Sequence, residues 1–134
     1  MNPVPSPGTP SEVSGPPVPV CSAKGCRLAA VWVLAWNNPR VFLDWSVLAS
    51  LFTTRLAGWL TEWLELLPAS KLLFGTDASS PELYYTAAVN GRRQLGAALD
   101  QLVTCGTLSR GAAMALAERV CFKNAVDLYG LGDV

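Results

Sequence analysis

The chain contains no histidine, which removes the commonest protein metal ligand and the commonest general base near neutral pH. Charge is also scarce, because ten Lys and Arg balance ten Asp and Glu among 134 residues. A chain without net charge has no field to attract nucleic acid or an anionic membrane surface. We therefore expect neither nucleic acid nor a membrane as a partner.

Cysteines and long apolar runs are scarce as well. The four cysteines are too few and too irregularly spaced for a disulfide scaffold, which predicts a reducing, cytoplasmic setting. The longest apolar run, residues 28–36, is about half of the roughly 20 residues needed to cross a bilayer. The proline-rich stretch before it has no early positive charge, unlike a secretory signal. With 51% hydrophobic residues, the composition predicts a globular unit with a core.

Composition divides the chain into three zones. Residues 1–20 contain seven of the ten prolines, which predicts a disordered or polyproline-like arm. Residues 21–40 form a short apolar segment that opens with a Cys-x4-Cys pair, and both a strand and a buried helix fit it. Two thiolates could supply half of a zinc site, but no second Cys or His pair follows, so we expect no metal there. Residues 41–134 form the third zone.

Two short strands and a helix between them are predicted at the start of the third zone. "VFLDWS" (41–46) and "KLLFGT" (71–76) are nearly continuous apolar runs, as expected of parallel strands covered on both faces. Helical spacing places six large apolar residues on one stripe between these strands, with Thr53 or Thr54 as the cap and Pro68 as the stop. The stripe consists of Leu56, Trp59, Leu60, Trp63, Leu64 and Leu67.

Helices fill the rest of the chain. One begins near Pro81, whether Ser79 opens a capping box with Glu82 or Ser80 is the cap, and it ends at Gly106. Gly91 and Gly96 weaken its middle, which predicts close packing or a bend. A last helix begins at about Ser109, and it either breaks near residues 123–124 or continues to Gly130.

The order strand, helix, strand, helix predicts a right-handed βαβ unit with parallel strands. In such folds chemistry gathers at the carboxyl ends of the strands, where Asp44 and Asp77 lie in this sequence. Asp77 has two interpretations. It is either a metal ligand or proton acceptor, or a carboxylate that bonds its own turn or caps the next helix.

The segment from Val41 to the end resembles the C-terminal part of amidohydrolase-related, metal-dependent TIM-barrel hydrolases. The resemblance depends on "PASKLLFGTDA" followed by "NAVDLYGL". It implies a helix-rich α/β fold that comprises the last two βα units of an incomplete barrel plus C-terminal helices. It also implies that Asp77 is the family aspartate that faces zinc or another divalent metal and activates water, and that residues 91–93 and 124–131 have structural roles.

This sequence departs from that family in ways that affect function. Family members carry a His-x-His pair and further histidines on earlier strands, which this chain lacks. A hydrolytic zinc site needs about three protein ligands. We therefore expect a fragment that is inactive alone and binds no cofactor, with a vestigial Asp77.

The alternative function is a non-catalytic interaction module or a homo-oligomer that forms through exposed strand edges. Because the rest of a barrel is missing, Trp59 and Trp63 are expected to keep apolar surface in water and to leave the molecule loosely packed. Residues 21–40 separately resemble the start of a family of small uncharacterised actinobacterial proteins with a Cys-x4-Cys opening and a "WNNP" step.

Overall fold

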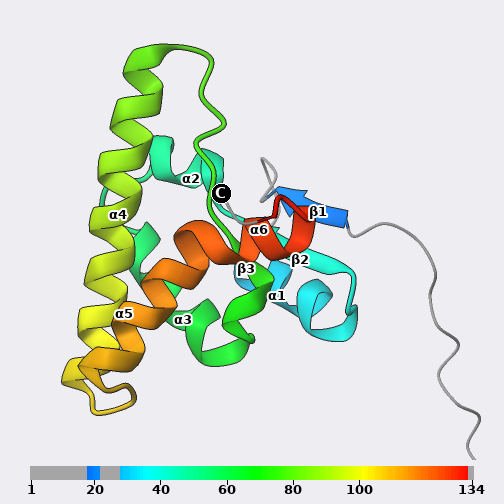
Figure 1. The fold of residues 1–134 in the computed structure, drawn as a ribbon. Coiled ribbons are helices and arrows are strands. Elements are labelled where there is room, and N and C mark those ends of the chain that lie inside the picture. Colours follow the sequence, from blue (N-terminus) through cyan, green and yellow to red (C-terminus); the bar gives the residue numbers. More distant parts are fainter. Residues whose placement is uncertain (1–17, 22–27, 133–134) are drawn as a thin grey trace, which may run out of the picture.

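The computed structural model describes residues 18–21 and 28–132. Helices predominate, and they surround a small sheet in which all described strands are parallel (Figure 1). The elements are, in order, β1 (Val18–Cys21), α1 (Leu28–Asn37), β2 (Val41–Asp44), α2 (Ser46–Leu51), α3 (Leu56–Leu66), η1 (Ala69–Lys71), β3 (Leu72–Leu73), α4 (Pro81–Thr104), α5 (Arg110–Glu118), η2 (Arg119–Lys123) and α6 (Asn124–Tyr129).

The sheet has the strand order β1-β2-β3. The parallel pairing of β2 with β3 confirms the predicted strand relation, with Leu43 opposite Leu72. A third strand, β1, was not predicted: Val18–Cys21 pairs with Val41–Asp44 and spans residue 20. The remainder of the predicted proline-rich arm, residues 1–17, lies outside the described residues, as does Cys26.

Segment 21–40 contributes a helix to the core, which resolves the choice between strand and helix. α1 buries Val31 and Ala35 and packs against β2 and α3. These two buried residues are four apart and so lie on one face of the helix. β1, α1 and β2 therefore form an additional βα unit beside the two predicted ones.

Both predicted strands are shorter than expected. β2 ends at Asp44 because the Asp44 carboxylate accepts a hydrogen bond from the Ser46 backbone N–H at 2.9 Å and turns the chain into α2. β3 ends at Leu73, opposite this turn, since no further β2 residue is present to pair with. After β3, Gly75 packs against Ser46, whose Cβ lies 3.2 Å from the position of an added Gly75 Cβ.

α4 is the longest described helix. It runs along one side of the molecule and contacts α2, α3 and α5 (Figure 1). Ser80 caps it by accepting a hydrogen bond from the Leu83 N–H, with Pro81 in the first turn, which decides between the two predicted caps. Gly106 ends it with a φ of 77°, as predicted. Gly91 allows the predicted close approach, because an added Cβ would lie 2.7 Å from the Phe74 ring, whereas Gly96 faces open space.

The predicted cap of α3 was wrong. Arg55 occupies the cap position without a side-chain hydrogen bond, and neither Thr53 nor Thr54 replaces it. Instead Gln94, buried on α4, accepts a hydrogen bond from the Ala57 N–H at 3.2 Å and donates one to the Thr53 carbonyl. The side-chain amide of Gln94, from a distant part of the chain, thus bonds backbone groups at the start of α3 that lack a partner within the helix.

The apolar stripe of α3 is buried as its spacing predicts. Leu56, Leu60 and Trp63 are at most 1% exposed, and Trp59 is partly buried against Phe52. The expectation that Trp63 keeps apolar surface exposed to water was therefore wrong. α4 and α1 pack against α3 and contribute to this burial.

The last helical segment runs from Arg110 to Tyr129 with an internal π-helical turn, η2. Ser109 caps its start and Gly130, with a φ of 62°, ends it. The two predicted alternatives were a break near residues 123–124 and a continuous helix to Gly130. Each is partly right, because the π-helical turn ends at Lys123 and α-helix then continues to Gly130. Among the described residues, no helix is both long and apolar enough to span a membrane.

Candidate functional site

Asp77 lies where the sequence places it, in the loop that follows the carboxyl end of β3. Its side chain is exposed, and within the described part of the chain it makes no hydrogen bond or ion pair. Its backbone is left-handed, with a φ of 46°, a conformation that Asp tolerates better than most residues. Asp77 caps neither its own turn nor α4, so the structural roles considered for it are not the ones observed.

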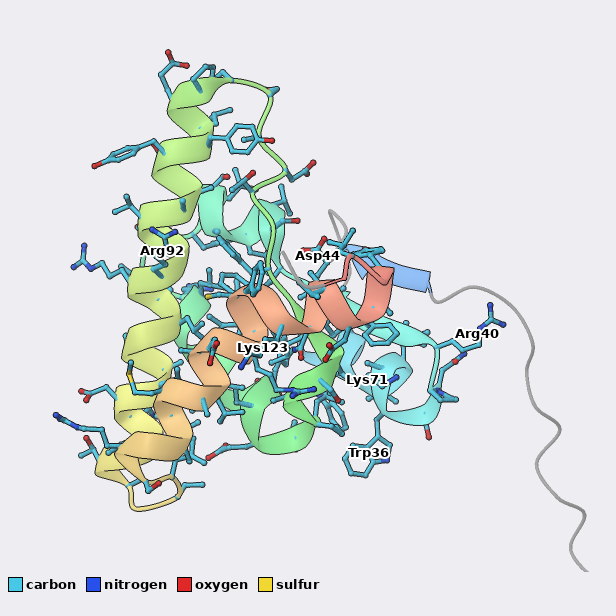
Figure 2. The ribbon with its side chains drawn as sticks, in the orientation of Figure 1. Trp36, Arg40, Asp44, Lys71, Arg92 and Lys123 are labelled. Atoms are coloured by element: carbon cyan, nitrogen blue, oxygen red, sulfur yellow. The ribbon has the colours of Figure 1, made fainter. Side chains whose placement is uncertain are left out.

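Asp44 is the last residue of β2, the neighbouring strand, and pairs with Leu73, the last residue of β3. One carboxylate oxygen is held by the Ser46 N–H at the start of α2. Asp44 is partly buried, and Figure 2 shows it beside the sheet at the end opposite Lys71. Its role in the structure is to turn the chain from strand to helix.

The residues at this edge of the sheet do not fit a hydrolytic zinc ion. Two aspartates at strand ends provide fewer than the three ligands that such a site needs, and the sequence offers no histidine to add. Among the residues that the structure describes, no three His, Cys, Asp or Glu side chains gather as a potential metal site. We derive no chemistry through a metal here.

A cavity of about 400 Å³ lies at the opposite edge, where the strands begin. Phe42, Lys71, Arg119 and Asp127 contribute to its wall. Arg119 and Asp127 form an ion pair at 3.3 Å. The two aspartates predicted as site residues, Asp44 and Asp77, do not line this cavity, so the cavity and the predicted site lie apart.

Lys71 connects the start of β3 to the turn before β2 and to the first residue of β2. Its ammonium donates hydrogen bonds to three backbone carbonyls, those of Asn38, Pro39 and Val41, and lies 4.7 Å from the Phe42 ring centre. Partial burial lowers the pKa of Lys71, while the three acceptors favour its charged form. All three N–H groups are used, which leaves none for a ligand.

Asn124 holds β3 from its outer edge. Its amide nitrogen donates to the carbonyls of Ala69 at 2.6 Å and Leu72 at 2.8 Å. The Leu73 carbonyl instead accepts from the Trp45 N–H on the β2 side. The Leu72 carbonyl therefore faces away from β2, and Asn124 bonds it where a neighbouring strand would otherwise pair. Asn124 is 3% exposed. The structural role expected for residues 124–131 is thus seen at Asn124.

Little in the sequence indicated the roles of Lys71 and Asn124. Lys71 and Asn124 both belong to the two quoted motifs, yet their partners lie 30 to 55 residues away along the chain. A polar residue at the first position of a short helical segment, Asn124, was the only local signal. Neither position was expected to bond backbone carbonyls.

The two described free cysteines differ in reactivity. Cys105 is exposed, whereas Cys121 is half-buried, and burial raises the pKa of its thiol against the opposing effect of Arg92. A raised pKa lowers the thiolate fraction at a given pH, and the thiolate is the reactive form. We predict that iodoacetamide at pH 8 labels Cys105 at least about tenfold faster than Cys121.

Peptide-resolved mass spectrometry measures both rates in the unmodified chain. The difference should shrink as the pH rises through the pKa of Cys121, because its thiolate then forms in the folded state. Equal labelling of the two cysteines at pH 8 would contradict the burial of Cys121.

The architecture therefore defines a helix-rich α/β protein with a small parallel sheet. Among the residues that the structure describes, Asp44 and Asp77 follow its strands without joining a group of three potential metal ligands. Comparison with protein-family models, with curated proteins and with solved structures gives no match for this chain.

Proposed function

We propose that this chain is a C-terminal unit of an amidohydrolase-like barrel that does not catalyse hydrolysis on its own. The observation that carries the proposal is the parallel pair β2 and β3, joined through helices, with Asp77 in the loop directly after β3. In parallel α/β folds this loop presents catalytic side chains. The motif "PASKLLFGTDA" extends across η1, β3 and that loop.

The absence of activity follows from the residues that the chain encodes. Hydrolysis by this type of centre requires a cation held by several ligands and a base to activate water. The chain has one aspartate free at the strand ends and no histidine. In this proposal the chain keeps the strands β2 and β3 and the helices of the barrel but not its metal ligands, and β1 and α1 add a further βα unit.

Metal analysis of the purified chain tests the proposal. After equilibration with zinc and gel filtration, we expect far less than one zinc per chain, and the same content in Asp77→Ala. Because cysteine thiolates are common zinc ligands, a variant with Cys21, Cys26, Cys105 and Cys121 changed to serine is the matched control. Stoichiometric zinc that survives in the cysteine-free variant and is lost with Asp77→Ala would overturn the proposal.

A second candidate function is self-association, and exposed apolar side chains favour it. Within the described residues, large apolar side chains that are 40–74% exposed occur mainly on α1, α4 and the C-terminal helices. The outer edge of β3 is partly occupied by Asn124, so helix faces support association better than that strand edge. The side chains in question are Val33, Leu34, Trp36, Leu51, Leu83, Tyr84, Tyr85, Val89, Met114, Phe122, Tyr129 and Leu131.

A further inference from the structure

We infer that two copies of this chain pair in an antiparallel manner through the first half of α4. The partner is a second copy, and the pairing surface is the α4 stripe formed by Glu82, Tyr85, Val89 and Arg92. This inference rests on the self-association proposed above and specifies its surface.

The α4 stripe is the uncovered part of a longer helix face. Residues 85, 89 and 92 follow the spacing i, i+4, i+7, which places them on one face, and residues 96 and 103 continue it. Gly96 and Val103 line a groove of about 290 Å³ together with α5 residues, so α5 lies against this face in the second half of α4. In the first half, Tyr85 is 74% and Val89 47% exposed.

The charges on the α4 stripe match a two-fold axis. In an antiparallel helix pair with an axis at the level of residue 87, Tyr85 meets Val89 of the second copy, and Val89 meets its Tyr85. The same axis places Glu82 opposite Arg92 of the second copy, at both ends of the contact. The apolar pair is thus central and the two opposite-charge pairs lie outside it.

Both charged residues are available for such contacts. Glu82 and Arg92 are exposed, and neither forms an intrachain ion pair within the described residues. The backbone N–H of Glu82 and the Ser80 hydroxyl lower the pKa of the Glu82 carboxyl, which keeps it ionised. Arg93, also exposed, adds a second cation at each end of the pair.

The shape of the molecule leaves room for this pairing. The N-terminal end of α4 is a free end, with only α2 and the loop after β3 beside it (Figure 1). Figure 2 shows Arg92 on α4, on the side of the molecule away from Trp36 and Arg40. In the antiparallel arrangement, the body of each copy extends past the free end of the other.

The contact is small, so the dimer should be weak. Four residues per copy bury much less than the roughly 800 Å² per partner of a stable interface. We expect a micromolar dissociation constant that increases with salt, because exposed charge pairs are screened.

Sedimentation equilibrium of the full chain and its charge variants tests the inference. Glu82→Arg and Arg92→Glu should each weaken dimerisation at least about tenfold, because each places like charges opposite one another. The double variant Glu82→Arg/Arg92→Glu should recover dimerisation to within about threefold of the original chain. Glu65→Arg, an exposed change of equal charge on α3, is the matched control and should leave dimerisation unchanged.

The outcomes separate this inference from the self-association on which it rests. If the chain dimerises but neither single variant weakens the dimer, or the double variant stays as weak as the singles, the α4 stripe is the wrong surface. If the chain stays monomeric at several hundred micromolar, self-association itself fails. Circular dichroism of each variant establishes that α4 remains folded, and Glu82→Gln separates loss of charge from its reversal.

Discussion

Replacing Trp45 by alanine should cost about 3–5 kcal/mol of stability, a large share of the roughly 5–15 kcal/mol that is typical of a native protein. Trp45 is fully buried between β2 and α4, with its ring centre 4.6 Å from that of Phe74. Its ring also lies 3.3 Å from the position of a Gly91 Cβ, so three elements pack around it. Removing the ring leaves a cavity at their junction. Urea denaturation followed by circular dichroism measures the loss.

Two matched variants define what the Trp45 result means. Trp36 is 63% exposed, and Trp36→Ala should change stability by no more than about 0.5 kcal/mol. Trp45→Phe should cost less than Trp45→Ala, because the indole N–H has no hydrogen-bond partner within the described residues and only volume is lost. A cost below about 1 kcal/mol for Trp45→Ala would show that the ring is not at the centre of the core.

Asn124→Asp should cost about 3 kcal/mol or more at pH 8. The change keeps the shape of the side chain but replaces the N–H donors with a carboxylate, which then faces the Ala69 and Leu72 carbonyls in a buried position. Burial and these acceptors raise the pKa of the new carboxyl above its unfolded value. The neutral carboxyl can donate one hydrogen bond to either of these two carbonyls, whereas the carboxylate can donate none.

The expected pH dependence follows from that raised pKa. The stability of Asn124→Asp is greatest below the unfolded pKa of Asp, near pH 4, and is lost as the pH rises through the folded pKa. Urea midpoints at pH 4.5 and pH 8, relative to the unmodified chain, measure this. Asp127→Asn, at an exposed position three residues further on, should stay within about 0.5 kcal/mol at both values. Equal stability of Asn124→Asp and the unmodified chain at pH 8 would contradict the bonds assigned to Asn124.

Local chemistry predicted the helices well. Ser80, Pro81 and Gly106 define the ends of α4 through capping and a left-handed C-terminal residue, which depend only on neighbouring residues. The burial of Leu56, Leu60 and Trp63 followed from helical spacing. β2 and β3 were expected as parallel strands, but their short lengths depend on the turn that Asp44 makes.

What the sequence could not supply was long-range pairing. Gln94 caps a helix that begins 38 residues before it, and Lys71 bonds carbonyls that precede it by 30 to 33 residues. Nothing local to these residues identifies those partners. β1 was missed because Pro19 argues against a strand, although prolines are tolerated on an edge strand, which β1 is.

The candidate site was predicted in position but not in conformation. Asp77 follows β3 as expected, since motif and strand pattern agree there. Its left-handed backbone and exposed carboxylate depend on how the loop passes Ser46 and the start of α4. The same loop leaves it without the neighbours that a catalytic carboxylate needs.

The central claim is that the isolated chain lacks a reactive centre, and hydrolysis by the purified protein tests it most directly. Ester and amide probes should release product at the buffer rate, with no change on addition of zinc, on chelation, or in Asp77→Ala. A rate above buffer that disappears both with a chelator and in Asp77→Ala would contradict the claim.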